Sequence, residues 1–570
     1  MNSADVLSLC KRRGFIWPAY EIYGGIAGLY DYGPMGAAMK NNIIQTWRKA
    51  YTLGEGFVEI DADTIGPEIV FKASGHLDQF SDALVSCTKC KTPYRADHLL
   101  KEHHPNPAAL SHGEMDDLIQ KVGMVCLECG GEISKVEDFN LMFKTYIGPG
   151  AAGRVGYLRP ETAQGMFYNF NSLHRHMREK LPFGVIQIGR GYRNEISPRQ
   201  GVIRLREFNM MEAELFIDPK DKTWPRFDSI KGDMIRLLPN DPGDAEITVT
   251  LEEALGKGII ANQTLAYFVG FTQRFLVKVG VDPERLRFRQ HLKTEMAHYA
   301  ADCWDAEALL SFGWTEIVGI ADRGCWDLSR HIEFSNVEMN GFRRYDEPVE
   351  VEKDVLKPKY GMLGPQYKAK SSAVGKALEA ADPKLIKDGA ITVQVDGAPM
   401  AVEAKYFDIA RVKEKVSGEK FVPHVIEPSH GLDRIMYTCL EHAYTEREEK
   451  EGKYLVMRLA PLSAPIKLGI FPLMGKDELT RPALEIDNEF RENEVATSYD
   501  DSGSIGRRYA RMDEVGTPYC VTVDYQTLED DTVTIRDRDS TAQVRVKRPV
   551  LLKTIMELLN GRKSFADLKG

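Results

Sequence analysis

The chain has 570 residues, of which 43% are hydrophobic and 28% charged, and this length and balance predict a globular protein of about two to four domains. Its formal net charge of -10 argues against non-specific coating of nucleic acid, although a local basic groove remains compatible with it. No apolar run reaches the roughly eighteen residues of a membrane span, and the start, MNSADVLSLCKRRGF, lacks the apolar segment of a secretory signal. A cytoplasmic protein without membrane contact is expected.

The first predicted elements are a helix and a strand. Residues 34–52 read as a helix with proline in its first turn. GEGFVEIDADTIGPEIV, residues 54–70, then alternates between apolar and polar residues like a strand that Pro67 ends.

Two close cysteine pairs follow. Each has the Cys-x2-Cys spacing, and in a large protein of a reducing compartment such pairs predict tetrahedral zinc rather than disulfides. The alternatives are a knuckle that has lost its metal, or free buried thiols. Four thiolates complete a closed site, so the nearby His98, His103, His104 and His112 are not expected as ligands. The predicted ligands are Cys87, Cys90, Cys126 and Cys129.

Residues 189–216 hold five arginines and four glutamates. The segments 184–195 and 204–217 look extended and enclose the turn-forming ISPRQG, which predicts an antiparallel hairpin. Because alternate residues of a strand share a face, Arg193 and Glu195 should point the same way, and Phe208, Glu212 and Glu214 should line one face of the partner strand. Such a set can hold a nucleotide: the guanidinium grips a phosphate, the carboxylate accepts from an amine and the ring stacks on a base. The alternative is a solvated surface hairpin with weak ion pairs.

The remaining chain alternates between dense and polar regions. Residues 218–285 are first polar and then have a helical pattern, as an insertion would. Residues 286–345 again have the composition of a buried core. A lysine-rich region, 346–420, contains a probable hairpin at AITVQVDGAPMAVEA. FVPHVIEPSHGLDRIMYTCLEHAY reads as a strand leading into a helix, and the charged link TEREEKEGK precedes a final region of alternating strands and helices, which predicts an α/β domain.

Three segments together resemble the signature motifs of the class II aminoacyl-tRNA synthetases. GFVEIDADTIGP resembles motif 1, which builds the dimer interface and ends in Pro67. The hairpin resembles motif 2, and GLDRIMYTCLEH resembles motif 3, whose arginine is Arg434 here. The resemblance implies an α/β (α+β) fold with an antiparallel catalytic sheet flanked by helices, insertions, and a C-terminal α/β anticodon-binding domain.

The resemblance extends to glycyl-tRNA synthetases of the archaeal and eukaryotic type, which implies a homodimer that joins glycine to tRNA(Gly) at the expense of ATP. The segments that carry it are GLYDYGPMGAAMKNNIIQTWR, YLRPETAQGMF, RNEISPRQGVIRLREF, EMAHYAADCWDAE, ADRGCWDLSRH, VIEPSHGLDR and DDSGSIGRRYARMDE. The expected regions are the catalytic core with motif 1 (1–86), a zinc-binding-like insertion (87–135), the core with motif 2 (136–217), an insertion (218–285), the core (286–345), an insertion (346–420), the core with motif 3 (421–458) and the anticodon-binding domain (459–570).

A glycine site must hold an ammonium group with acceptors and exclude larger residues by filling the space near Cα. By match to the family motifs, Glu161, Glu212, Glu427 and Ser429 are expected around the amino group. Arg323 is expected to face the carboxylate or its adenylate.

The ATP site implied by the resemblance uses three catalytic residues. Arg193 would hold the α-phosphate, Glu195 the adenine amine and Arg434 the γ-phosphate, while Phe208 stacks on adenine. Mg2+ would bridge the phosphates, with Glu427 as one contributor. Two further arginines of the hairpin either contact phosphate or simply flank it; they are Arg204 and Arg206.

Basic clusters in the last region are suited to single-stranded loops of tRNA, the alternative being a solvated basic face. The tRNA-binding candidates are Arg507, Arg508, Arg536 and Arg538, with Arg511, Arg545, Lys547 and Arg548 beside them.

Three rival interpretations stay open. The protein can be a class II synthetase for another amino acid, against which the glutamates of RPETAQG and VIEPS argue. It can be a catalytically silent, tRNA-binding relative, against which Arg193 and Arg434 argue. EMAHYAADCWDAE can also be a helix or strand that only packs the core.

Overall fold

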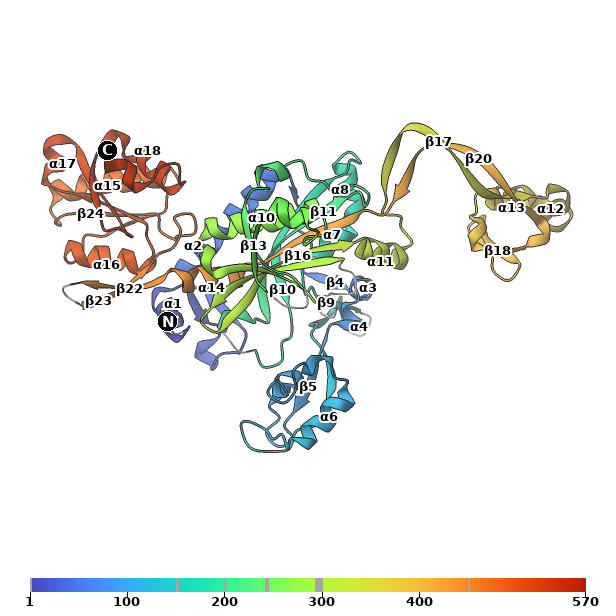
Figure 1. Ribbon diagram of the computed structural model, residues 1–570, viewed down its shortest axis with the longest axis horizontal. Coiled ribbons are helices and arrows are strands. Elements are labelled where there is room, and N and C mark those ends of the chain that lie inside the picture. Colours follow the sequence, from blue (N-terminus) through green and yellow to red (C-terminus); the bar gives the residue numbers. More distant parts are fainter. Residues whose placement is uncertain are drawn as a thin grey trace. The chain divides into compact units, whose positions relative to one another are not determined.

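The computed structural model describes residues 3–149, 153–198, 201–240, 245–292, 301–449 and 452–569 (Figure 1). The chain divides into two compact units, residues 1–339 with 422–570, and residues 340–421. Residues 199–200 of the motif 2 loop and the first six residues of EMAHYAADCWDAE lie outside the described residues. No described helix combines the length and the apolar character needed to cross a bilayer.

The larger unit is built on a nine-stranded sheet in the order β13-β12-β14-β15-β16-β21-β11-β10-β3. The pairs β12–β14 and β10–β3 are parallel and the others along the sheet are antiparallel, which agrees with the expected synthetase sheet. Its strands are β3 (Val58–Glu59), β10 (Phe183–Tyr192), β11 (Glu207–Ile217), β12 (Met234–Leu238), β13 (Ile247–Thr250), β14 (Leu286–Gln290), β15 (Asp302–Leu310), β16 (Gly313–Gly324) and β21 (His424–Gly431).

The predicted hairpin is confirmed as β10 and β11, which pair from Phe183 with Phe216 to Tyr192 with Glu207. The described part of EMAHYAADCWDAE falls in β15, whose residues are mostly buried within the sheet. Its interpretation as a packing strand is therefore confirmed for that part.

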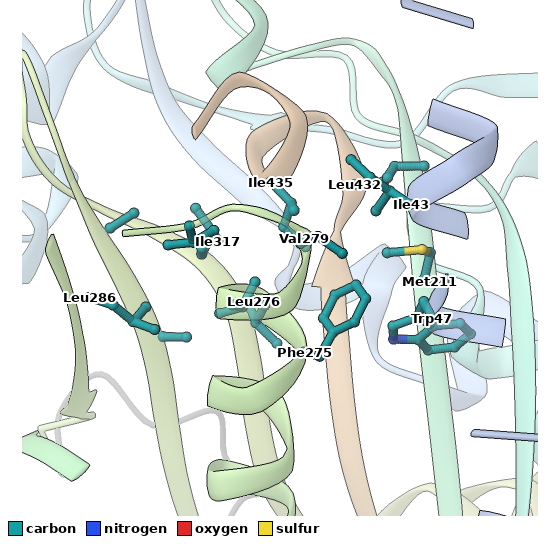
Figure 2. Close-up of a cluster of buried hydrophobic side chains, with 14 of the residues drawn as sticks. Ile43, Trp47, Met211, Phe275, Leu276, Val279, Leu286, Ile317, Leu432 and Ile435 are labelled. Atoms are coloured by element: carbon teal, nitrogen blue, oxygen red, sulfur yellow. The ribbon is translucent and has the colours of Figure 1, made fainter. Parts of the chain in front are cut away.

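One face of the sheet is covered by three helices, α2 (Pro34–Lys49), α10 (Gln263–Val279) and α14 (Leu432–Ala443). Proline opens α2 at its first position, and the Asn262 side chain caps α10 by accepting from the Leu265 N–H at 2.9 Å. Fully burying a large apolar side chain stabilises the fold by roughly 1.5–3 kcal/mol. Figure 2 shows such side chains from the three helices meeting those of the sheet: Ile43, Trp47, Met211, Phe275, Leu276, Val279, Leu286, Ile317, Leu432 and Ile435.

Residues 218–285 differ from the expected insertion. They supply strands β12 and β13 to the large sheet, and α10 lies in the main hydrophobic core. The segment packs as part of the core because its helix buries apolar side chains along most of its length, which the polar stretches around it conceal in the sequence.

The predicted motif 1 strand is also different, because it is broken into two. After β3 the chain bends and forms β4 (Ile65–Pro67), which belongs to another sheet with β9 (Arg154–Leu158) and β8 (Lys144–Ile147). Arg159 holds the bend, since its guanidinium donates to the Ala62 carbonyl at 2.7 Å and its N–H to the Thr64 carbonyl at 2.9 Å.

The cysteine region is a small module with its own sheet and hydrophobic core. Its helix α6 (His112–Lys121) starts in a capping box between Ser111 and Glu114. The other elements are β5 (Ser81–Ser86), β6 (Pro93–Arg95), α5 (Ala96–Leu99) and β7 (Glu137–Asn140).

The last region is α/β, as predicted, with a five-stranded sheet in the order β25-β24-β26-β27-β28 and a separate core. The charged link before it forms a hairpin, β22 (Tyr444–Glu449) with β23 (Gly452–Met457). The elements of the region are β24 (Leu468–Pro472), α15 (Asp477–Glu492), β25 (Thr497–Tyr499), α16 (Ile505–Val515), β26 (Tyr519–Val523), α17 (Tyr525–Asp530), β27 (Thr532–Asp537), β28 (Gln543–Lys547) and α18 (Arg548–Leu559).

The smaller unit starts and ends with two long antiparallel strands, β17 (Gly341–Pro358) and β20 (Phe407–Phe421), drawn as neighbouring arrows in Figure 1. Between them lie α12 (Tyr360–Tyr367), α13 (Ser371–Glu379) and the predicted hairpin, β18 (Ala390–Val395) with β19 (Ala398–Glu403). These elements share a hydrophobic cluster of their own.

Candidate active site and cysteine cluster

Alternation along β11 separates the hydrophobic core from a polar face of the sheet. Met211, Ala213 and Leu215 belong to the core under the three helices, so Glu212 and Glu214 point to the opposite face. Glu212 lies opposite Ser429 of β21, and the Ser429 hydroxyl donates to Glu212 Oε1 at 2.6 Å. The two central strands therefore present their polar side chains together.

A pocket of about 150 Å³ lies where the β10–β11 hairpin meets β21 and the start of α14. It brings together five of the residues predicted to bind ATP, from both sides of the motif 2 turn and from motif 3. Its lining consists of Arg193, Glu195, Val202, Ile203, Arg204, Leu205, Phe208, Asn209, Met210, Glu316, Ile317, Ser429, Gly431, Asp433 and Arg434.

Arg193 is held between two aromatic rings. Its guanidinium carbon lies 5.3 Å from the ring centre of Phe208 and 5.2 Å from that of Phe80, within the range of a cation–π interaction. Its Nε donates to the Pro160 carbonyl at 3.3 Å. A cation and an aromatic face are thus placed side by side, as nucleotide binding requires.

Arg434 is placed by the first turn of α14. The preceding Asp433 is buried and accepts from the Asn209 N–H at 2.5 Å and from the Asn209 side chain at 2.9 Å, and the Tyr32 hydroxyl also donates to it. Arg434 Nη1 donates to the Glu316 carboxylate at 3.1 Å. The start of α14 is therefore hydrogen-bonded to β11 and to β2 (Tyr30–Tyr32) before any ligand binds.

The other hairpin residues separate into two groups. Arg204 Nε lies 4.0 Å from Glu195 Oε2, and both residues line the pocket. Arg206 instead donates to the carbonyls of Ala27 at 2.7 Å and Glu195 at 3.0 Å. Of the two alternatives for these arginines, the structure gives Arg206 the flanking role and leaves Arg204 facing the pocket.

The residues expected around glycine form a second, more buried group on the same face. Glu212 is only 1% exposed, and its Oε2 accepts from the Thr162 N–H at 2.7 Å and from the Thr162 hydroxyl at 2.5 Å. Glu161 Oε1 accepts from the Gln164 side chain at 2.8 Å, and its Oε2 lies 3.6 Å from His76 Nε2.

Arg323 is the buried cation of this group. It makes a two-pronged contact with Asp327, at 2.7 and 2.8 Å, and its Nη1 donates to Glu427 Oε2 at 2.8 Å. Asp327 lies in α11 (Trp326–Ser335), so one guanidinium ties that helix to β21. In this structure Arg323 positions Glu427. Although Glu427 was also expected at the phosphates of ATP, it lies in this buried group and does not line the first pocket.

The carboxyl groups of the second group differ in ionisation. Burial, together with the Glu212 and Glu161 carboxylates, raises the pKa of Glu427 to about 7 against the opposing charge of Arg323. Burial and the charge of Glu161 also raise the pKa of Glu212. Burial favours neutral Glu161 as well, yet the charge and hydrogen bond of His76 hold the pKa of Glu161 below its usual range. Such spread values are typical of functional sites.

Two family models match the chain. The tRNA synthetase class II core domain (G, H, P, S and T) matches residues 151–238, and the anticodon binding domain matches residues 467–558. Glycine–tRNA ligase of Methanothrix thermoacetophila is 52% identical over 99% of this chain and 98% of the relative. Those of Archaeoglobus fulgidus (49%, over 100% and 99%) and Methanocaldococcus jannaschii (47%, over 97% and 98%) are similar along their whole lengths. The chain belongs to the glycine–tRNA ligase family.

In this member of the glycine–tRNA ligase family, the four predicted cysteines meet in one cluster. Their sulfur atoms all lie within 4.8 Å of one another, and the Cys87–Cys129 and Cys90–Cys126 distances are both 3.5 Å. Zinc–sulfur bonds of about 2.3 Å in a tetrahedron give sulfur separations of about 3.8 Å. A side chain at Gly131 would meet the Cys87 sulfur at 2.9 Å, so the turn needs glycine. Among the described residues no histidine joins the group.

Three of the four arginines predicted to bind tRNA are buried in the C-terminal region, which argues against direct contact between their side chains and RNA. Arg536 is 5% exposed and pairs with the buried Asp513 at 2.8 and 2.9 Å. Arg538, 3% exposed, donates to two backbone carbonyls at 2.9 Å and to Asp539. Arg508, 2% exposed, donates to the backbone carbonyls of Pro472, Asp501 and Gly503. These three stabilise the domain, whereas Arg507 is exposed.

Several site residues escaped the sequence interpretation. Asp433 and Tyr32 sit inside segments that resemble the family, GLDR and YDYG, but the sequence alone assigned them no role. Phe80 and Glu316 lie in no motif-like segment, and their contact with the pocket depends on the fold. Thr162 follows Glu161 directly, so the run PET was the available signal for a donor to Glu212.

Proposed function

We propose that the chain activates glycine with ATP, forming glycyl-adenylate and releasing pyrophosphate, and then transfers glycine to the 3′ end of tRNA(Gly). Its curated relatives bear the name glycine–tRNA ligase. The observation that carries the proposal is the position of Ser429. This residue lines the nucleotide pocket and hydrogen-bonds to Glu212, which belongs to the buried group of carboxylates expected around glycine. An amino acid in the second group therefore lies next to a nucleotide in the first.

The first pocket is the ATP site. Arg193 holds the α-phosphate, because its guanidinium is already oriented by Phe208 and Phe80. Phe208 covers the adenine face, Glu195 accepts from the adenine amine and Arg434 takes the γ-phosphate in exchange for Glu316. Arg204 adds a second cation at the pocket edge.

The second group is the glycine site. Glu161, Glu212 and Glu427 surround the ammonium, and the Ser429 hydroxyl keeps Glu212 in place. Their near-complete burial excludes a larger amino acid, because a substrate side chain would have to displace packed atoms. Arg323 orients Glu427 and lies beside the substrate carboxylate.

Magnesium supplies charge neutralisation to the phosphates when ATP binds. Mg2+ prefers carboxylate oxygens, and Glu316 offers one in the lining of the ATP pocket, while Glu427 is the contributor expected from the sequence. The rest of the chemistry is alignment and charge stabilisation by the chain's arginines, since the substrate carboxylate is itself the nucleophile.

The four cysteines hold a structural zinc ion. The sulfur separations fit a tetrahedral thiolate site, and the N–H groups of Lys89 and Cys90 both approach the Cys87 sulfur at 3.4 Å. The ion ties the two Cys-x2-Cys turns of the module together. We infer that the module lies near the acceptor end of tRNA, because Ser197 of the motif 2 loop donates to the Pro93 carbonyl of the module at 2.6 Å.

The chain forms a homodimer through the region of motif 1. Four large apolar side chains are exposed on β4, β8 and the adjoining helix, and exposed apolar patches mark protein interfaces. They are Ile65 (48% exposed), Ile69 (49%), Tyr146 (63%) and Ile147 (40%). Pro67 lies among them, at the end of β4.

The C-terminal region binds the anticodon loop of tRNA(Gly), in keeping with its match to the anticodon binding domain. Of the four arginines predicted for this role, Arg507 keeps it, because its side chain is exposed at the start of α16.

The test is exchange of labelled pyrophosphate into ATP with each of the twenty amino acids and without tRNA. We expect exchange with glycine alone. Exchange with a different amino acid would retain the nucleotide site and overturn the glycine site. Absence of exchange in folded, metal-replete protein would favour a silent tRNA-binding protein.

A further inference from the structure

Glu214 is a buried carboxyl group to which none of the proposed roles gives a use. It is 0% exposed, and neither carboxyl oxygen has a hydrogen-bond partner among the described residues. A fully ionised carboxylate without donors is costly in such a place. Natural proteins seldom keep a group of this kind at an inner position without a function.

Its position in the sheet is next to the glycine site. The β11–β21 register pairs Glu212 with Ser429 and Leu215 with Ile426, which sets Glu214 opposite Glu427. Directly opposite residues of antiparallel strands have their Cβ atoms about 4.5–5.5 Å apart. Glu214 shares its face with Glu212, and Glu212 meets Ser429 there, so the Glu214 and Glu427 side chains face the same space.

The charges around Glu214 are mostly negative. Glu427 lies on β21, Glu212 on its own strand and Asp327 on α11, and the cation is Arg323 of β16. Arg323 donates to both Asp327 and Glu427. The neighbour on β10 is the apolar, buried Val185. Burial and these carboxylates raise the pKa of Glu214 well above its usual value.

We propose that Glu214 and Glu427 hold one proton between them, with Glu214 the protonated member that donates to the Glu427 carboxylate, and that this pair keeps Glu427 ionised toward the amino group of glycine. Glu214 is thus a positioning residue, since it acts on the substrate only through Glu427. The proton stays within the pair throughout the reaction. The proposal rests on the proposed glycine site.

The pairing explains why a carboxyl group is placed where an apolar side chain would pack. Two opposed carboxyls that share a proton have two well-separated pKa values. The first proton leaves at a lower pH than from an isolated carboxyl, and the second leaves at a higher pH. An apolar residue at position 214 would leave Arg323 as the side chain that donates to Glu427. Glu427 would then gain its charge only at higher pH, and glycine would bind less well in mildly acidic solution.

Two variants of nearly equal size test this. Glu214→Gln keeps a neutral donor, and Glu214→Met removes it. The measurement is kcat/KM for glycine in pyrophosphate exchange from about pH 6 to about pH 9, with KM for ATP and the thermal unfolding midpoint recorded for each protein. We expect the Gln profile to coincide with that of the wild type. We expect the Met variant to move the acid limb upward by about one pH unit, equivalent to a tenfold loss at the low-pH end.

If Glu214 were ionised, the expected shifts of the acid limb would have the opposite direction. Removing its charge would then ease the ionisation of Glu427, so both variants would move the acid limb to lower pH and weaken glycine binding above it. That result, or three superimposed profiles, would overturn the proposal. If the Met variant does not fold, Glu214→Leu replaces it as the apolar variant, because an unchanged Gln profile must be set against the profile of a variant without a donor. Failure of the wild type to exchange with glycine would overturn the proposed function instead.

Discussion

The hydroxyl of Ser429 donates to Oε1 of Glu212 at 2.6 Å, while Thr162 occupies Oε2 of the same carboxylate. This contact joins the motif 2 strand to the strand that leads into motif 3. It lies on the boundary between the nucleotide pocket, which Ser429 lines, and the carboxylate group proposed for glycine. Two sites made by separate motifs thereby share one hydrogen bond.

Ser429→Ala should weaken glycine binding with little effect on ATP. The variant leaves one buried carboxylate oxygen of Glu212 without its donor, and losing a hydrogen bond to a charged group costs about 1.5–3 kcal/mol. We expect KM for glycine to rise about tenfold or more in pyrophosphate exchange, with KM for ATP changed less than about twofold.

Ser311→Ala is the matched control, because the Ser311 hydroxyl donates to the buried Glu441 carboxylate at 3.0 Å outside both pockets. It should lower stability without changing either KM. Equal changes in the glycine KM of the two variants would contradict the role given to Ser429.

The affinity for glycine should depend on pH through Glu427. With a pKa of about 7, this carboxyl is ionised above neutrality and becomes protonated as the pH falls. The protonated form attracts an ammonium group less, so KM for glycine should rise progressively below about pH 7 while KM for ATP stays level. Glu427→Gln should remove the pH dependence and keep KM at its high value. A glycine KM that is flat between about pH 6 and about pH 8 in the wild type would disagree with this ionisation.

Arg536 and Arg507 should behave oppositely on substitution. Arg536→Ala leaves the buried Asp513 with a weaker set of partners, and breaking a buried ion pair costs about 3–5 kcal/mol. We expect a lower unfolding midpoint for the C-terminal domain. Arg507→Ala removes an exposed side chain of α16, so it should leave the midpoint unchanged and raise KM for tRNA, more so at low salt.

The measurements are thermal unfolding and tRNA charging at two salt concentrations. Unchanged stability on loss of Arg536, together with weaker tRNA binding, would restore the original interpretation of that residue as an RNA contact.

The elements that the sequence predicts well are those with a local signal. Patterns over a few residues, namely alternation, turn residues and helical spacing, predict three elements. They are the β10–β11 hairpin, the helix that carries Arg434 and the hairpin at residues 390–403. The motif-like segments also lead to the residues that line the nucleotide pocket, because each segment places its side chains from one element.

Contacts made across long distances in the sequence were not predictable in this way. A count of arginines cannot distinguish Arg536, which pairs with Asp513, from Arg507, which faces solvent. The break in motif 1 depends on Arg159, nearly one hundred residues further along the chain. The role of residues 218–285 in the large sheet likewise depends on the pairing of β12 with β14, which no local pattern encodes.

Removal of one cysteine ligand should abolish metal binding and loosen only the module. Cys129→Ser replaces the thiol proposed as a zinc ligand by a hydroxyl that stays protonated. We expect about one zinc per wild-type chain by elemental analysis and almost none in the variant, with new protease cleavage confined to residues 87–135. Cys325→Ser is the control, because Cys325 is a half-buried free thiol outside the cluster.

The distribution of the damage decides the role of the ion. The module has a hydrophobic core separate from the catalytic one, so pyrophosphate exchange with glycine should persist in Cys129→Ser while charging of tRNA declines. Loss of both activities together would mean that the module also supports the motif 2 loop, through the Ser197–Pro93 hydrogen bond. A wild-type protein that is folded, active and free of metal would show that the four thiols pack without an ion.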